Sequence, residues 1–163
     1  MRTSPLSAFQ TVYWDHDRRR PGSPAVILRA YDVIGPLDLD ALTDAVAATT
    51  RRHESLRTRF VPGAGEPRQV TEPDVPVAVR TVDLRGLDPD GRAAGIREQE
   101  VRERHTPFDL GRAPLWRLTL LRLAEREHVL LLAAHHIVAD GWSMSVLAAD
   151  LSGGADTDRA GTG

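Results

Sequence analysis

Two apolar runs in the C-terminal half constrain the fold more than any other feature of the chain. Leu115–Leu123 and His128–Ala134 are rich in leucine, valine and alanine, and the charged segment Ala124–Glu127 separates them. Apolar runs of strand length around a short polar connection predict the two strands of a β-hairpin. The fold must therefore be built from strands as well as helices.

The other predicted elements are groups of strands between helices. Leu39, Leu42, Val46 and Thr49 lie on one helical stripe, which predicts a helix that begins near Asp38. Further helices are expected at Ser7–Arg19, Arg92–His105 and Trp142–Leu151. Further strands are expected at Ala25–Ile34, Ser55–Val61, Arg68–Thr71 and Val77–Val82, with a loop at Leu84–Gly91. Because the strands come in consecutive groups, this order favours an α+β fold, a two-layer sandwich in which a mixed β-sheet packs with helices.

The chain is long enough for one compact domain and too short for two ordinary ones. Its 163 residues are 41% hydrophobic and include no cysteine. A core of that size supports a fold without cross-links, and disulfide scaffolds and cysteine-based zinc sites are excluded. Residues 152–163 contain no large apolar side chain. We therefore expect one domain at residues 1–151 and a flexible tail at residues 152–163.

Charge and hydropathy limit the classes of partner. The 21 basic residues, all of them arginine, and 23 acidic residues give a net charge of −2, which supplies no general field for a nucleic-acid backbone. The apolar stretch Val129–Ala134 is much shorter than the ~18 residues that cross a bilayer, and Met1–Gln10 has no signal-peptide segment. We therefore expect a soluble cytoplasmic protein that binds neither nucleic acid nor membrane.

The residues best suited to chemistry follow the second apolar run. His135 and His136 come at its end, and Asp140 and Gly141 lead into the last predicted helix. Side chains at the end of a strand are held rigidly, and an imidazole there suits a general base. In an extended backbone the two histidines face opposite sides, so one can point into a pocket while the other braces the loop.

Two other interpretations apply to the same segment. Adjacent histidines on a strand do not converge easily on one ion, and no third ligand lies at a zinc spacing, so no metal site is predicted. A purely structural interpretation has two partly buried histidines and Asp140 as a helix cap. The spacing alone does not choose between that interpretation and an active site. The histidines at other positions, His16, His105 and His128, are expected to be exposed.

Four segments, in order along the chain, resemble conserved blocks of the condensation domains of nonribosomal peptide synthetases. Ala134–Ser143 resembles the HHxxxDG block with the Trp-Ser that often follows it, and Arg52–Phe60 matches the pattern RHExLRTxF. Leu6–Trp14 keeps the Leu-Ser, Gln and Trp of the opening block and departs from it elsewhere. Pro107–Leu110 is also similar to a segment of these proteins.

This resemblance implies a single lobe of a fold similar to chloramphenicol acetyltransferase. It also implies a reaction in which an amine or hydroxyl attacks the thioester of a substrate carried by a carrier protein. His136 corresponds to the residue nearest the reacting group, as a general base or an orienting acceptor, with His135 beside it. No cofactor is expected to bind directly, because the phosphopantetheine arm of the carrier protein delivers the substrate.

The resemblance also suggests roles around the histidine pair. Asp140 is expected to be structural, paired with an arginine such as Arg57 or capping the final helix. Gly141 would let the backbone approach the substrate arm closely. Trp142 and Ser143 complete the expected substrate-binding segment, although the tryptophan is more easily explained by packing than by recognition.

Condensation domains of this family have two lobes with a tunnel between them, and the resemblance covers one lobe. Three hypotheses follow. The chain is an acyl-transfer component completed by a second condensation lobe, which a partner or self-association supplies. Alternatively, it is a non-catalytic docking module for carrier proteins or synthetase modules, or an inactive half-domain.

Overall fold

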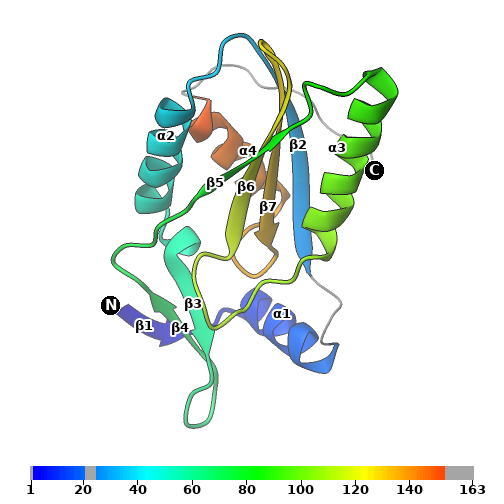
Figure 1. The fold of residues 1–163 in the computed structure, drawn as a ribbon. Coiled ribbons are helices and arrows are strands. Elements are labelled where there is room, and N and C mark those ends of the chain that lie inside the picture. Colours follow the sequence, from blue (N-terminus) through cyan, green and yellow to red (C-terminus); the bar gives the residue numbers. More distant parts are fainter. Residues whose placement is uncertain (1, 21–24, 153–163) are drawn as a thin grey trace.

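A mixed four-stranded sheet forms the centre of the protein in the computed structural model, which describes residues 2–20 and 25–152 (Figure 1). The strand order is β2 (Val26–Ile34), β7 (Glu127–His135), β6 (Trp116–Ala124) and β5 (Val79–Asp83). β5 runs parallel to β6, and the other neighbours are antiparallel. The predicted hairpin is confirmed as β6 and β7, which occupy the two central positions.

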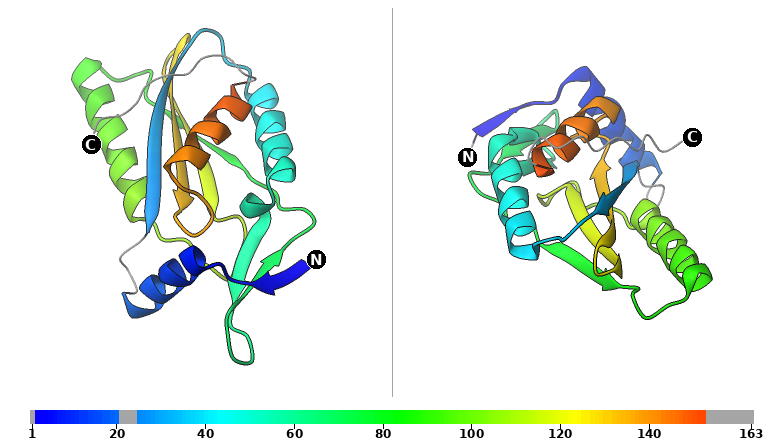
Figure 2. Two further views of the ribbon diagram at one scale, coloured as in Figure 1. Left: turned by 180° about the vertical axis from the view of Figure 1, so that it is seen from behind. Right: turned by 90° about the horizontal axis from the view of Figure 1, so that it is seen from above.

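Helices cover both faces of this sheet (Figure 2). α2 (Leu39–Arg52) and α4 (Gly141–Leu151) pack on one face, and α3 (Pro89–His105) packs on the other. Along β7, Leu130, Leu132 and Ala134 belong to the core under α2 and α4, whereas Val129, Leu131 and Ala133 belong to the core under α3. Because both faces of β7 are buried, its sequence is continuously apolar instead of alternating.

A second sheet of three antiparallel strands lies beside the first (Figure 1). Its order is β1 (Arg2–Pro5), β4 (Arg68–Thr71) and β3 (Thr58–Val61). β1 was not expected, because its four residues have no apolar alternation. The predicted strand Ser55–Val61 is wrong in its first part: Glu54–Arg57 forms a 3-10 turn, η1, whose start is closed by the Leu56 N–H donating to the His53 carbonyl over 3.1 Å.

The first residue of each α-helix is set by a side chain that caps the helix. α1 (Ala8–Arg19) begins with a capping box, in which Ser7 Oγ accepts from the Gln10 N–H and the Gln10 side chain accepts from the Ser7 N–H. α3 begins three residues before the predicted Arg92, because Asp88 caps it and Pro89 occupies its first turn. The predicted loop at Leu84–Gly91 is correspondingly shorter.

The α+β class and the mixed sheet packed with helices are confirmed, and the structure adds a helix layer on the second face. Apart from Ser152, which caps the C-terminal end of α4, the predicted tail lies outside the described residues. No helix in the described part of the chain is long and apolar enough to cross a membrane.

Candidate active site

The two adjacent histidines lie where β7 ends and a turn begins. His135 is the last residue of the strand, and its N–H donates to the Leu115 carbonyl over 2.9 Å. The next N–H, of His136, donates to the carbonyl of Ala25 over 2.8 Å, just before β2. The expected extended backbone therefore stops between the two histidines. Hydrogen bonds to the chain on both sides hold the start of the turn in place.

His135 is the buried member of the pair, with a residue exposure of 1%. Its Nδ1 accepts from the Ile137 N–H over 3.0 Å, and its Nε2 lies 3.1 Å from Oδ2 of Asp17 on α1. Because a backbone N–H only donates, the proton of the neutral ring lies on Nε2, which donates to Asp17. Burial lowers the pKa of His135, and the Asp17 carboxylate opposes this without reversing it. His135 is thus a neutral brace between the turn and α1.

His136 is partly buried and stacks on Tyr13, with ring centroids 5.1 Å apart and an interplanar angle of 2°. Within the described part of the chain, neither of its ring nitrogens makes a hydrogen bond. Burial lowers the pKa of His136, the carboxylate of Asp140 raises it, and the guanidinium of Arg29 lowers it further. The net effect favours a neutral imidazole with a lone pair that can accept a proton.

Asp140 caps α4 rather than pairing with Arg57. Its Oδ1 accepts from both the N–H and the hydroxyl of Ser143, each over 2.7 Å, and these hydrogen bonds lower the pKa of the Asp140 carboxyl. The Arg57 guanidinium instead donates to backbone carbonyls, including those of Thr50 at 3.1 Å and Glu72. The pairing expected between Asp140 and Arg57 is therefore wrong. The carbonyls at the C-terminal end of α2 need donors, and Arg57 supplies them.

The three residues after Asp140 differ in what they contact. A Cβ added to Gly141 would meet Nη2 of Arg29 at 3.8 Å, an ordinary contact, so the position is open. Trp142 is 80% exposed, so the prediction that it packs against the rest of the protein is wrong for the residues that the structure describes. Ser143 is engaged with the carboxylate of Asp140. A cavity of about 130 Å³ next to Trp142 is lined by residues that include His53 and Val138.

Three side chains around the histidines were not singled out as site residues from the sequence: Tyr13, Asp17 and Arg29. Tyr13 and Asp17 lie one turn apart on the predicted helix Ser7–Arg19, and that spacing was the only local sign that they share a face. Their contact with β7 joins segments far apart in the chain. His128, predicted to be exposed, is 3% exposed instead and its Nδ1 has no partner among the described residues.

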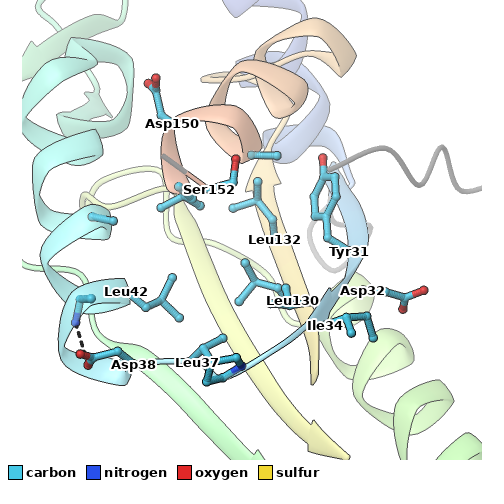
Figure 3. Close-up of a pocket in the computed structure, with 16 residues that line it drawn as sticks. Tyr31, Asp32, Ile34, Leu37, Asp38, Leu42, Leu130, Leu132, Asp150 and Ser152 are labelled. Carbon is cyan, nitrogen blue, oxygen red and sulfur yellow. Dashed lines mark hydrogen bonds between the residues drawn. The ribbon is translucent and has the colours of Figure 1, made fainter. Parts of the chain in front are cut away.

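A larger cavity of about 670 Å³ lies between β2, α2 and α4 (Figure 3). Leu42, Leu130 and Leu132 form part of its apolar lining, and Ile34 lies at its edge. Because Ile34 pairs with Glu127 and Val26 pairs with His135, this cavity and the histidine pair lie toward opposite ends of β2 and β7. The cavity is therefore separate from the candidate site.

Among the described residues, no group of three histidine, aspartate or glutamate side chains is arranged to hold a metal ion. The polar groups of the candidate site are the His136 imidazole, the His135 brace beside it and the capped start of α4.

Comparisons with known proteins agree on one family. The family model of the condensation domain matches residues 1–160. The chain is 41% identical over 149 residues to phosphinothricin tripeptide synthetase PhsC of Streptomyces viridochromogenes, in a match that covers 91% of this chain and 14% of that protein. It is also 51% identical over 112 residues to chondramide synthase cmdD of Chondromyces crocatus, and this match covers 69% of this chain and 3% of that protein.

Solved structures show the same similarity. The first condensation domain of the calcium-dependent antibiotic synthetase, in complex with a substrate analogue, matches with a TM-score of 0.85 at 28% identity. The cyclization-docking bidomain of a synthetase from Sorangium cellulosum matches with a TM-score of 0.77 at 30% identity. The match covers 93% of this chain in both cases, but only 37% and 30% of the solved chains. The chain thus spans a minor part of each relative.

Proposed function

Because the chain belongs to the condensation-domain family of nonribosomal peptide synthetases, we propose that it is the histidine-bearing lobe of an acyl-transfer site. The observation that carries this proposal is the state of His136, a partly buried imidazole with a lowered pKa and no hydrogen bond to its ring in the described part of the chain. An imidazole of this kind is available to a substrate, whereas that of His135 is occupied by Asp17 and Ile137.

The proposed reaction joins two substrates that carrier proteins deliver on phosphopantetheine arms. The amine or hydroxyl of the acceptor attacks the thioester carbonyl of the donor. The lone pair of His136 takes the proton from that nucleophile, or accepts a hydrogen bond that orients it. The C–S bond then breaks, the proton of the nucleophile ends on the leaving sulfur so that the donor arm departs as a thiol and His136 is neutral again, and the acyl group stays on the acceptor as an amide or ester. This route needs no covalent enzyme intermediate and no directly bound cofactor.

The start of α4 shapes the proposed site. The cap made by Asp140 fixes the first turn of α4, and its carboxylate raises the pKa of His136 against the larger effect of burial. Gly141 has no side chain and leaves space for a substrate arm. Trp142, whose indole is exposed, and Ser143 are the next two residues of the chain. We propose that these three residues contact the substrate, and that Arg57 is a structural support at the C-terminal end of α2.

A second lobe completes the site in this proposal. General-base assistance depends on positioning and on the exclusion of water, and a partly exposed imidazole on one lobe meets the second requirement poorly. The solved relatives that match are longer than this chain by more than a factor of two, since it covers 37% of the first condensation domain. Another segment, a partner synthetase module or a second copy of the chain can supply the missing wall, and we place this assembly in the cytoplasm.

A non-catalytic role in docking carrier proteins is the second candidate. The 80% exposed indole of Trp142 favours it, because tryptophan is enriched at protein–protein interfaces relative to the rest of the surface. In this role the chain binds a carrier protein but does not catalyse transfer.

The decisive experiment mixes the chain with the second lobe of a condensation domain and with loaded donor and acceptor carrier proteins. His136→Ala should lower the rate of product formation by about 10²–10⁴-fold, the usual contribution of general-base catalysis. Its free energy of unfolding should stay within about 1 kcal/mol of wild type, because the ring is only partly buried. His105→Ala, which removes an exposed histidine on α3, is the matched control and should leave the rate unchanged.

Two outcomes would contradict the catalytic proposal. Equal rates for His136→Ala and wild type would remove His136 from the mechanism. Carrier-protein binding that survives His136→Ala, together with no turnover by the wild-type assembly, would favour the docking role.

A further inference from the structure

One face of α1 meets both histidines of the candidate site. Tyr13 lies parallel to the ring of His136 and meets the ring of His135 edge-on, with centroids 6.4 Å apart at 84°. One turn further along the helix, Asp17 accepts the hydrogen bond of His135. A single helix therefore contacts the side chains of two consecutive residues, the last residue of β7 and the first residue of the turn after it.

We propose that Tyr13 is a positioning residue that sets the orientation of the His136 imidazole by stacking against its face. This inference rests on the proposed function, in which that imidazole meets the substrate. The backbone of His136 is held by its hydrogen bond to Ala25, but within the described part of the chain no hydrogen bond holds the ring. The torsion that turns an imidazole has broad minima, so the ring needs a contact on its face to keep one orientation.

Tyr13 is itself held firmly enough to serve as a support. The ring of Phe9, one turn earlier on α1, packs edge-on against Tyr13 with centroids 4.9 Å apart. The capping box at Ser7 fixes the start of the helix, and the bond between Asp17 and His135 ties the helix to the end of β7. The stack is thus part of a packed unit.

The geometry also indicates which feature of Tyr13 matters. No hydrogen bond from its hydroxyl is found among the described residues, whereas its ring is parallel to His136 within 2°. A phenylalanine offers the same face and should replace it. An alanine removes the face but suits the interior of a helix better than tyrosine does, so α1 should persist.

The charged groups that act on His136 are the carboxylate of Asp140 at the start of α4 and the guanidinium of Arg29 on β2. The neutral ring of His135 lies next to it in the chain. A substitution at position 13 leaves Asp140 and Arg29 unchanged, and the bond to Asp17 still holds His135. A change in the His136 titration in a Tyr13 variant therefore reports on the cover that the tyrosine gives to the ring.

The test is an NMR titration of the full chain, with the ring signals of His136 assigned by their loss in His136→Ala. In wild type and Tyr13→Phe, the His136 ring protons should show the displacement that a stacked aromatic ring causes, and the same lowered pKa. In Tyr13→Ala the displacement should vanish and the pKa should rise toward its ordinary value. Val12→Ala, at an exposed neighbouring position on α1, is the matched control and should resemble wild type.

Two results would overturn the proposal: His136 signals and pKa unchanged in Tyr13→Ala, or Tyr13→Phe behaving like Tyr13→Ala. If Tyr13→Ala reduces the folded population, Tyr13→Leu, which keeps apolar bulk without a ring, replaces it: the displacement of the His136 ring signals should still vanish, whereas the pKa should change less. None of these readouts requires turnover. A failure here is therefore separate from a failure of His136 in the acyl-transfer assay.

Discussion

Two buried ionisable side chains beside the central sheet, Glu103 on α3 and His135 at the end of β7, are held in opposite charge states. Glu103 on α3 is 3% exposed and accepts hydrogen bonds from Arg117, from Arg80 at 3.2 Å and from Thr119 at 2.8 Å. His135 at the end of β7 is 1% exposed, and among the described residues its ring has one side-chain hydrogen-bond partner, the carboxylate of Asp17. The first is a closed network of charges, and the second is a neutral brace.

The pKa directions express the same difference. Burial raises the pKa of Glu103, but hydrogen bonds from Arg117 and Thr119 and the nearby guanidinium charge lower it overall, so the group stays ionised. Burial lowers the pKa of His135 and outweighs Asp17, so the imidazole stays neutral. The network around Glu103 binds α3 to the sheet and leaves no acceptor for a substrate. The brace at His135 leaves its neighbour His136 available, which suits a site that must react.

The largest loss of unfolding free energy is expected from a substitution of Glu103. Glu103→Ala leaves the guanidinium groups of Arg117 and Arg80 without their buried counter-charge, and it should lower the free energy of unfolding by about 3–5 kcal/mol. Urea denaturation measures the change. Glu98→Ala, at an exposed position on the same helix, is the matched control and should change it little. Equal losses in the two variants would mean that the network contributes nothing.

A smaller loss of unfolding free energy is expected when the partner of His135 is removed. Asp17→Ala leaves the buried Nε2–H of His135 without an acceptor, which should cost about 1–3 kcal/mol. Asp15→Ala removes an exposed carboxylate from the same helix, where its contact with Arg19 is 3.8 Å long, and serves as the control. If both variants unfold at the same urea concentration as wild type, the hydrogen bond between Asp17 and His135 does not stabilise the fold.

His135 and Glu103 should affect stability in different ranges of pH. The pKa of His135 is lowered on folding, so the unfolded chain binds the proton more readily and stability falls as pH drops below about 6.5. The pKa of Glu103 is also lowered, but for a carboxyl this adds stability that is present above about 4.3 and lost only as pH falls through the lower folded value.

Between pH 7 and pH 5 the loss should therefore come from His135 and its neighbour His136, whose pKa values are both lowered on folding, and not from Glu103. Each unit of pKa difference contributes about 1.4 kcal/mol. Denaturation at several pH values measures the slope, and His135→Gln should flatten it. A slope that is the same in His135→Gln and wild type would assign the acid sensitivity to other groups.

The smallest effects are expected at the start of α4. Asp140→Ala removes the cap and should lower the melting temperature by about 2–4 °C, a shift typical of one lost cap in a domain of this size. Gly141→Ala should leave the melting temperature unchanged, because its added Cβ makes only an ordinary contact with Arg29. Thermal unfolding of both variants measures the difference. A larger loss in Gly141→Ala would show that the glycine is needed for the fold and not for substrate access.

Local patterns in the sequence were sufficient for much of the fold. The apolar runs predicted β6 and β7, and the apolar stripe from Leu39 to Thr49 predicted α2 and its start near Asp38. Asp140 as the cap of α4 was one of two structural roles left open by its position. These elements were found because their signals lie within a few neighbouring residues.

Contacts between distant segments could not be predicted in the same way. β1 has only four residues and forms a strand because β4 pairs with it across the chain. The donors of Arg57 meet carbonyls, which have no signature in the sequence, so a carboxylate partner was expected instead. The stack of Tyr13 on His136 joins residues of α1 to the turn after β7, and it depends on how the helix packs.

The most direct test of the account compares two titrations of the assembled protein. One is the rate of amide formation between carrier-bound substrates as a function of pH, and the other is the NMR titration of the His136 ring. The account predicts that the rate falls on acidification with the same midpoint as protonation of His136, because only the neutral imidazole accepts from the nucleophile. A rate that stays constant through the protonation of His136 would contradict it.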